Sequence, residues 1–200
     1  MGNKTHLINE TFTNASDRTG KRITTFNTIL ATQIGTWNVR TMNGITKLAQ
    51  LEKEMTKYNV KILGLSEIRW TGSGEITTPK NNTIIYSGPT DNSGERGVGI
   101  FIEKQFKNSL IEWNPISDRL IVARFKNKFK NVSFINCYAP TETTIDEEKD
   151  EFYEQLTTAL MNCPKTDIIV LVGDFNAQME NRKTNCSGVH GIGKSTNNNG

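Results

Sequence analysis

Two apolar runs place the strongest constraint on how this chain can fold: "VKILGLSE" at residues 60–67 and "DIIVLVGDFNAQ" at residues 167–178. Each run is almost continuously apolar over the length of one strand, which is the pattern of a strand buried on both faces. A strand of that kind needs a layer of structure on either side of it. The sequence therefore predicts a layered fold, in which both faces of a sheet are covered.

The first run belongs to a strand–helix–strand unit. Before it, "QIGTWNV" at residues 33–39 has the pattern of a short strand, and the segment 44–58 has a helical period. The apolar residues on one face of that helix, at spacings of three and four, are Ile45, Leu48, Leu51, Met55 and Tyr58. A strand, a crossover helix and a second strand predict a parallel pair with a right-handed connection.

The middle of the chain reads mainly as strands. Residues 69–82, rich in Gly, Thr and Asn, predict a loop. Four strand patterns follow, with Asn127-Lys128 as a candidate hairpin turn between the last two: "TIIYSG", "GVGIFIE", "RLIVARFKN" and "KNVSFINCYAP". A second helix is predicted over 144–161, with a capping box formed by Thr144 and Glu147. Its buried stripe is formed by Phe152, Leu156 and Leu160. Seven or eight strands and two helices predict an α+β fold of two sheets with helices outside.

Composition divides the chain into a tail and a domain. The apolar runs lie between Ile34 and Val172, and residues 1–32 are predicted to be a disordered polar tail because they bury too little to offset their ordering entropy. Residues 33–200 are predicted to be one folded unit. A net charge of +3 permits a nucleic-acid partner and fits an ordinary solvated surface equally well.

The cysteines and the absence of long apolar stretches bear on the compartment. There are three cysteines, an odd number without zinc spacing, which predicts reduced thiols. No stretch approaches the roughly 20 apolar residues of a membrane span, and the N-terminal residues lack an apolar signal core. We expect an intracellular monomer, nuclear or cytoplasmic, that does not enter a membrane.

Polar side chains follow three of the predicted strands at the point where each strand ends. Asn38 follows one, Glu67 the next, and Asp174 and Asn176 the last. Taken singly, such residues are usually turn residues or solvated groups. Together they predict two carboxylates and two amides at one rim, a set that suits Mg²⁺ and phosphoryl chemistry. Tyr138 ends another strand; it either closes that strand before Ala-Pro or donates to a phosphate oxygen, and spacing does not choose between the two.

A different motif, "GVHGIGKS" at residues 188–195, fits the phosphate-binding loop pattern of nucleotide-binding enzymes. A working loop of that kind directly follows a buried strand and opens a helix. Here the preceding strand ends at Asp174, and only "TNNNG" follows the motif. We therefore expect no nucleoside triphosphate at this loop.

Five motifs occur in an order that resembles a known family: "TWN", "LGLSEIRWTG", "GVGIF", "NCYAPT" and "VLVGDFNAQ". The set is similar to the endonuclease/exonuclease/phosphatase family, which includes deoxyribonuclease-I-like enzymes and AP endonucleases. Within this family, the residues of the five motifs resemble most those of the endonuclease domains of non-LTR retrotransposons and of craniofacial development protein 2-like proteins. The resemblance implies a four-layer αββα sandwich. It also implies metal-dependent hydrolysis of phosphodiesters, usually in DNA, with Mg²⁺ or Mn²⁺.

The resemblance also assigns roles to the residues at the strand ends. Glu67 would be the metal-binding carboxylate, and Asn38 would support the metal and the phosphate. Asp174 would activate or orient the attacking water, and Asn176 would hold the scissile phosphate. Tyr138 would donate to that phosphate in the transition state.

Four further residues are candidates for DNA contact. Arg69 and Trp70 follow the carboxylate in a Gly-rich loop, where a cation and an aromatic ring could contact DNA; a salt bridge and a core Trp explain them equally well. Asn197 and Asn199 lie in the "N-x-NG" segment that follows the family's Gly-rich loop.

The chain departs from the family pattern at two places. Arg40 stands where some members carry an Asp, and the Ser-Asp-His motif that closes the family's domain is absent; neither His6 nor His190 can replace its histidine. We therefore expect residues 33–200 to be the N-terminal two-thirds of the domain, with weak Mg²⁺ binding and poor or no cleavage of DNA. The alternatives are a non-catalytic remnant that binds nucleic acid or protein, and a phosphatase of small molecules.

Overall fold

The computed structural model describes residues 32–91 and 93–178. In this part of the chain there are nine strands, two α-helices and one 3₁₀ helix. In chain order they are β1 (Gln33–Asn38), α1 (Ile45–Lys57), β2 (Val60–Ser66), β3 (Ser73–Thr77), β4 (Thr83–Ser87), β5 (Val98–Ile102), η1 (Lys104–Ser109), β6 (Leu110–Ser117), β7 (Leu120–Phe125), β8 (Val132–Tyr138), α2 (Asp146–Asn162) and β9 (Ile168–Asp174).

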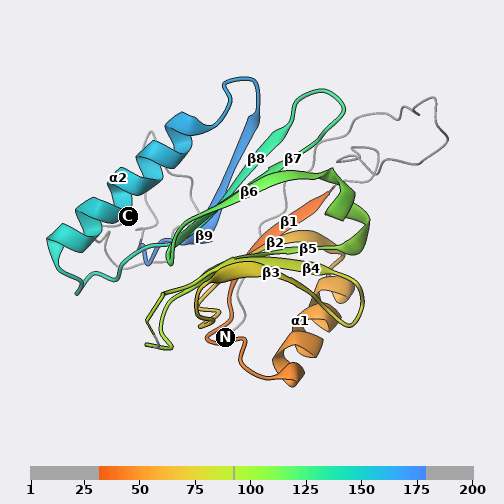
Figure 1. Ribbon diagram of the computed structural model, residues 1–200, viewed down its shortest axis with the longest axis horizontal. Helices are drawn as coiled ribbons and strands as arrows, with labels where there is room; N and C mark the ends of the chain where they lie inside the picture. The colour runs from red at the N-terminus through yellow and green to blue at the C-terminus, as the bar shows by residue number, and fades with distance from the viewer. Residues whose placement is uncertain (1–31, 92, 179–200) are drawn as a thin grey trace.

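The strands form two sheets that pack face to face between the helices (Figure 1). The first sheet has the strand order β1-β2-β5-β4-β3, and the second has the order β6-β7-β8-β9. The four layers are therefore α1, the first sheet, the second sheet and α2. This is the α+β sandwich that the sequence predicts.

Each sheet contains one parallel pair whose strands are joined through a helix. In the first sheet β1 and β2 are parallel and α1 connects them, as the strand–helix–strand pattern predicts. In the second sheet β8 and β9 are parallel and α2 connects them. All the other neighbouring strands are antiparallel. Because parallel strands end at the same edge of a sheet, each pair brings two strand ends to one rim.

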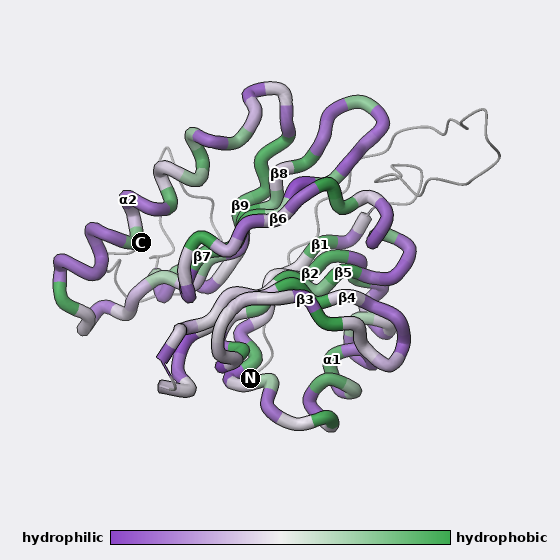
Figure 2. Tube along the Cα trace, viewed as in Figure 1, coloured by the Kyte–Doolittle hydropathy of each residue, from purple (hydrophilic) through white to green (hydrophobic). Residues whose placement is uncertain are grey.

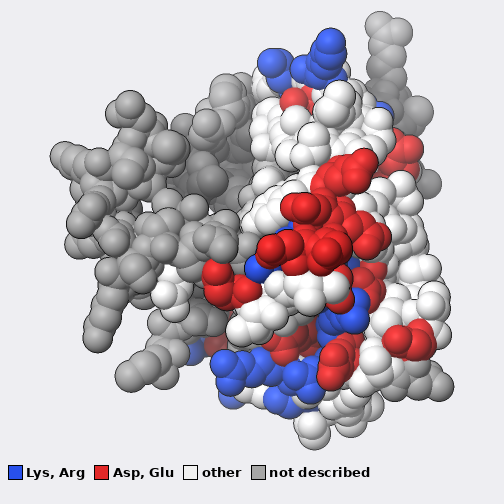
Figure 3. All heavy atoms as spheres, turned by 90° about the vertical axis from the view of Figure 1, so that its left-hand side faces the viewer, with Lys and Arg blue, Asp and Glu red and all other residues white. Residues whose placement is uncertain are grey.

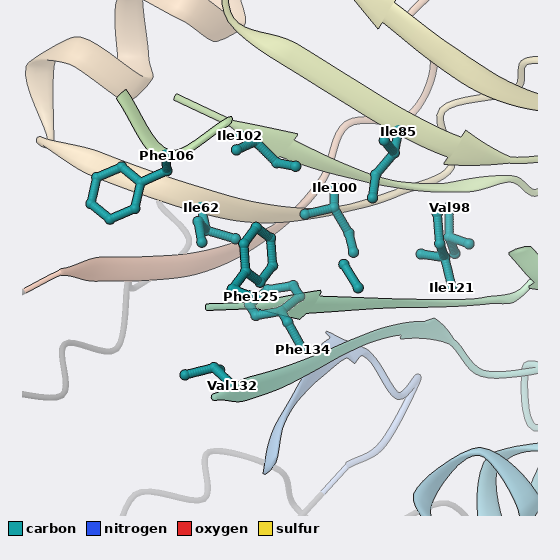
Figure 4. Close-up of a cluster of buried hydrophobic side chains, with 11 residues drawn as sticks. Ile62, Ile85, Val98, Ile100, Ile102, Phe106, Ile121, Phe125, Val132 and Phe134 are labelled. Carbon is teal, nitrogen blue, oxygen red and sulfur yellow. The ribbon is translucent and has the colours of Figure 1, made fainter. Parts of the chain in front are cut away.

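The main core lies between the two sheets (Figure 4). There Ile62 and Ile100 of the first sheet pack against Phe125 and Phe134 of the second, and each of the four is fully buried or nearly so. The two phenyl rings meet edge to face, with centroids 6.5 Å apart. Smaller clusters hold α1 and α2 to the outer faces of the sheets. Figure 2 shows the apolar residues concentrated along the central strands.

Two strands lie where the sequence did not predict them. β3 occupies part of the predicted loop 69–82, where it pairs with β4. β6 pairs with β7, although it contains Pro115. Both are edge strands with one exposed face. Edge strands need fewer apolar residues, so their sequence pattern is weak.

The predicted helix bounds agree with the structure to within two residues, but the predicted cap of α2 was wrong. The N-cap residue of α2 is Ile145 and no side chain caps the helix, so Thr144 and Glu147 form no capping box. The Thr144 hydroxyl instead meets that of Thr141, because the preceding turn brings these two residues together. In α1 the predicted apolar face is buried only in its middle, and Ile45 is 76% exposed because the helix end extends beyond the sheet. Tyr58, just past the helix, is likewise exposed.

Strand β9 is less buried than predicted. Val170 and Val172 are half-buried and pack against the core between the sheets. On the other face Ile169 and Leu171 are exposed by 44% and 37%. The reason is that α2 packs over β7 and β8, through contacts of Phe152 and its neighbours, and does not cover β9. Neither of the described helices is long and apolar enough to cross a membrane.

Candidate active site

The candidate site lies at the rim where the two parallel pairs end. Asn38 is the last residue of β1 and pairs in register with Ser66, so Glu67 follows directly at the end of β2. Tyr138 is the last residue of β8 and pairs in register with Asp174, the last residue of β9. The fold thus brings four polar residues together from sequence positions up to 136 residues apart.

Asn38 connects the two carboxylates. Its side-chain amide donates to Oε1 of Glu67 at 2.7 Å and to Oδ2 of Asp174 at 2.9 Å. Its own oxygen accepts the backbone N–H of Arg40 at 3.1 Å, which fixes the orientation of the amide. All three side chains are half-buried. A neutral amide therefore holds two anionic groups close together without adding charge.

Tyr138 completes the polar cluster around Glu67. Its phenol donates to Oε1 of Glu67 at 3.2 Å, and Arg69 forms an ion pair with Oε2 at 3.2 Å. Burial acts to raise the pKa of Glu67, but the hydrogen bonds from Asn38, Arg69 and Tyr138 outweigh it and hold this pKa below its ordinary value. Burial, together with the neighbouring Glu67 carboxylate, raises the pKa of Tyr138. At neutral pH the site therefore presents an ionised Glu67 beside a protonated phenol.

The backbone at the site adopts an uncommon conformation. Glu67 has φ of 55° and Asn176 has φ of 48°, in the left-handed region that side chains other than glycine seldom occupy. Asn176 is held there by its side chain, which donates to the Ala139 carbonyl at 2.7 Å, and by its backbone N–H, which donates to Oδ1 of Asp174 at 3.0 Å. Such strain is tolerated where the surrounding structure fixes it, and it occurs often at functional sites.

A cleft of about 520 Å³ opens beside Glu67 and Tyr138. Three arginines line it. Arg69 was predicted as a DNA contact, whereas Arg96 and Arg119 were not predicted from the sequence. Arg119 lies with its guanidinium 5.3 Å from the centre of the Tyr138 ring, and burial lowers its pKa. Arg96 forms an ion pair with Asp118 at 3.2 Å. Both arginines lie at turns before strands, a position that carries no signal in the sequence.

Acidic side chains also lie at and near this cleft. Figure 3 shows the end of the molecule on which α2 lies, with acidic side chains in a broad band and basic side chains gathered below it. The first turn of α2 carries Asp146, Glu147 and Glu148, and the last of these lines the cleft. The cleft is therefore lined by charges of both signs: three arginines and the carboxylates of Glu67, Glu95 and Glu148.

The residues predicted to contact DNA fall into two groups. Arg69 is exposed at the cleft and is already paired with Glu67. Trp70 is half-buried and packs edge to face on Tyr86, with ring centroids 5.0 Å apart. Asn197 and Asn199 lie outside the described residues, as do His6, His190 and the "GVHGIGKS" segment.

The donor set can be tested against the metal that the resemblance implies. In the described ranges no group of three or more His, Cys, Asp or Glu side chains could hold a metal ion. Glu67 and Asp174 remain as two ionisable oxygen donors joined through one amide. That number matches Mg²⁺, which is bound through one or two carboxylates and keeps several waters. The residues present therefore fit a magnesium site in which the protein supplies few ligands and water supplies the others.

The four-layer sandwich with two carboxylates at its rim places the chain in the deoxyribonuclease-I-like fold class. An AP endonuclease from Archaeoglobus fulgidus has the same fold, with a TM-score of 0.56 at 21% identity over 74% of this chain and 58% of that one. The 3′ phosphatase NExo from Neisseria, solved with a product DNA hairpin, gives 0.53 at 22% identity over 72% and 58%.

The chain belongs to the Endonuclease/Exonuclease/phosphatase family, whose sequence pattern matches residues 35–185. Craniofacial development protein 2 of Bos taurus is 38% identical over 161 residues, which are 80% of this chain and 27% of that protein. The same protein of Tragulus javanicus is 37% identical over 161 residues, 80% of this chain and 28% of that protein. The chain therefore spans little more than a quarter of the length of these relatives. The activities named in the family description are hydrolytic.

Proposed function

We propose that this domain hydrolyses phosphodiesters in DNA with the help of Mg²⁺ or Mn²⁺. The observation that carries the proposal is the Asn38 amide, which holds the carboxylates of Glu67 and Asp174 together at a strained rim. Two anions held side by side in a half-buried site are costly unless cations compensate them. Arg69 pairs with Glu67, and none of the ion pairs in the described residues involves Asp174, so a further cation at this rim would be favourable. A divalent cation bound there would neutralise charge on a phosphate.

Each residue at the rim has a role in this proposal. Glu67 would hold the metal ion, and Asn38 would support the metal site by orienting Glu67. Asp174 would accept a hydrogen bond from the attacking water and orient it. Tyr138, whose raised pKa keeps the phenol protonated at neutral pH, would donate to a phosphate oxygen. Asn176 would donate to the scissile phosphate.

The charges around the cleft support a polyanionic substrate that approaches from one side. The arginine wall, formed by Arg69, Arg96 and Arg119, offers cations to a phosphate backbone, whereas Glu95 and Glu148, which line the same cleft, would repel one. DNA would therefore lie along the arginine wall. That a similar fold was solved with product DNA supports this substrate. The more specific assignment, a retrotransposon-type endonuclease, rests on the "SEIRWTGSG" segment.

The rate should be low for these 200 residues. No histidine lies in residues 32–91 or 93–178, so no imidazole faces the cleft from the described part of the domain. A positioned acid or phosphate donor contributes about 10² to 10⁴ in rate. Slow cleavage and weak metal binding are the expected properties.

Nicking of supercoiled plasmid tests the proposal. Purified chain should nick plasmid slowly with Mg²⁺ or Mn²⁺ and not with EDTA, and Asp174→Asn and Glu67→Gln should remove the activity. Asp150→Asn, which changes an exposed carboxylate on α2 that does not line the cleft, is the matched control. Nicking that survives in both site variants would refute the assignment. Rates typical of a complete nuclease would refute the expected impairment.

The second candidate is a non-catalytic domain that binds nucleic acid, and the absence of a described histidine favours it. It predicts DNA binding that weakens with salt and with Arg119→Ala, without any metal-dependent nicking. A panel of small phosphate monoesters distinguishes both candidates from a phosphatase.

A further inference from the structure

Asn136 is a polar residue in the middle of the core between the sheets. It lies on β8 and is fully buried. Alternate residues of a strand share a face, so Asn136 faces the first sheet together with Phe134 and Tyr138. Its neighbours on that face belong to an apolar cluster. A buried amide in such a place needs hydrogen-bond partners, and its partners indicate what it holds.

The amide of Asn136 reaches across to the first sheet. Its Nδ2 donates to the Leu65 carbonyl at 2.8 Å and to the Gly99 carbonyl at 3.0 Å. These two residues are register partners on β2 and β5, so one amide group holds two adjacent strands. Because both acceptors are carbonyls, the orientation of the amide is fixed. Asn136 is therefore a direct polar link between the two sheets.

The facing strand is adapted to this link. Gly64 lies opposite Asn136, and a Cβ atom there would come within 2.3 Å of Oδ1 of Asn136 and 2.9 Å of Cγ2 of Val172. Any larger residue at position 64 would displace the amide. Oδ1 of Asn136 and the hydroxyl of Ser66 are buried without a hydrogen-bond partner in the described part of the chain. Unpaired buried polar atoms destabilise a fold, so this core is not optimised for stability.

On both sheets the link lies two residues before the residue that contributes to the candidate site. Asn136 is two residues before Tyr138, and its acceptor Leu65 is two residues before Glu67. The Tyr138 phenol and the Glu67 carboxylate are themselves joined across the sheets at 3.2 Å. A shift of one sheet against the other would therefore alter the distance between the strand ends that carry the site.

We propose that Asn136, in the space left by Gly64, is a positioning residue that fixes the separation of the two sheets and so holds Glu67 beside Tyr138 and Asp174. It acts through the backbone of β2 and touches neither substrate nor metal. The consequence for catalysis rests on the proposed metal-dependent function. The effect of Asn136 on the position of Glu67 beside Tyr138 and Asp174 is independent of that function.

The test uses Asn136→Leu and Gly64→Ala, which remove the same link from opposite sheets, in the full chain. Phe125→Leu is the matched control, because Phe125 of β7 lies in the same core, far from the rim, and pairs with Val132 at the start of β8. The first readout is the NMR signal of the Asn38 side-chain amide, which reports its bonds to Glu67 and Asp174 without any metal. Both variants should shift this signal and the control should not. A wild-type Asn38 signal in folded Asn136→Leu would overturn the inference.

The second readout is Mn²⁺ affinity, measured by electron paramagnetic resonance. Loss of an outer residue that orients a metal ligand weakens binding by about tenfold or more, and the control should bind as wild type does. If wild type itself binds no Mn²⁺, the proposed function fails, and the Asn38 signal still decides whether Asn136 positions the site.

A double variant covers the case in which the single variants fold but are too unstable for these two readouts. Asn136→Ala removes the atoms that a Cβ at position 64 would meet, so Gly64→Ala should lower the melting temperature less in that background than in wild type. Equal losses in the two backgrounds would show that the two positions are not coupled and would overturn the inference.

Discussion

Asn38→Ala should destabilise the domain in a way that depends on pH. The substitution removes two hydrogen bonds from one amide to two carboxylates, at 2.7 Å and 2.9 Å. A hydrogen bond to a charged group contributes about 1.5–3 kcal/mol when it is well buried. Here water can replace part of that at a half-buried rim, so we expect a total loss of about 1–2 kcal/mol. For a domain of this size that corresponds to a fall of about 2–8 °C in melting temperature.

The sign of the pH dependence follows from Glu67. Burial acts to raise the pKa of Glu67, and the hydrogen bond from Asn38 is the largest of the effects that lower it. The pKa of Glu67 in the folded state is therefore below its ordinary value of 4.5. A carboxylate with a lowered pKa in the folded state stabilises the fold above about pH 4.5, and this stabilisation is lost as the pH falls through the folded-state pKa. The difference between wild type and Asn38→Ala should therefore be largest at pH 6–8 and should shrink below about pH 4.

Thermal unfolding followed by circular dichroism from pH 3 to pH 8, without metal, measures this difference. Asn43→Ala is the matched control, because Asn43 is an exposed asparagine in the loop that follows β1. It should leave the melting temperature within about 1 °C of wild type. A difference between wild type and Asn38→Ala that stays constant across the pH range would refute the reasoning, as would a variant more stable than wild type at neutral pH.

Three further substitutions probe the site and the outer layer. Tyr138→Phe should lower the metal-dependent nicking rate about a hundredfold with little change in DNA affinity, because it removes the phenol O–H, which donates to Glu67 in the free domain and would donate to the phosphate during the reaction; an unchanged rate would exclude Tyr138 from the chemistry. Glu52→Ala removes the buried acceptor of the Thr78 hydroxyl and should cost about 2–3 kcal/mol in urea unfolding, and an unchanged urea midpoint would contradict this. Gly173→Ala would place a Cβ 2.0 Å from the Cys137 carbonyl oxygen and should cost about 1–3 kcal/mol, whereas wild-type stability would mean that the strand relaxes freely.

The fold was predictable where the chain repeats a strand–helix–strand unit, because helical and strand periods differ clearly and a crossover helix implies a parallel pair. Two of the edge strands, β3 and β6, were not predictable, since they bury only one face and their sequences contain Gly74 and Pro115. The capping box of α2 was predicted wrongly because Thr144 hydrogen-bonds within the preceding turn. Local capping patterns do not reveal such competing partners.

The convergence of Asn38, Glu67 and Asp174 was predictable in outline from their positions after strands. The direction of the Asn38 amide was not, because it depends on the register of β1 and on the N–H of Arg40. The role of Asn136 could not be predicted from the sequence, for a different reason. It lies within an apolar run, and only the packing of β8 over Gly64 shows that its amide crosses between sheets.

The two halves of the sandwich explain why a site forms at this rim. Each parallel pair ends with both strands pointing the same way, so β1 and β2 deliver Asn38 and Glu67 while β8 and β9 deliver Tyr138 and Asp174. Within a sheet these positions are fixed by backbone register, which is rigid. Between the sheets they depend on side-chain packing, which adjusts more readily. The Asn38–Asp174 and Tyr138–Glu67 contacts both cross between the sheets. The proposed chemistry therefore depends on how the sheets pack against each other, which is less rigid than the register within a sheet. A polar link between the sheets two residues below the rim, such as that of Asn136, supplies the rigidity that apolar packing alone does not.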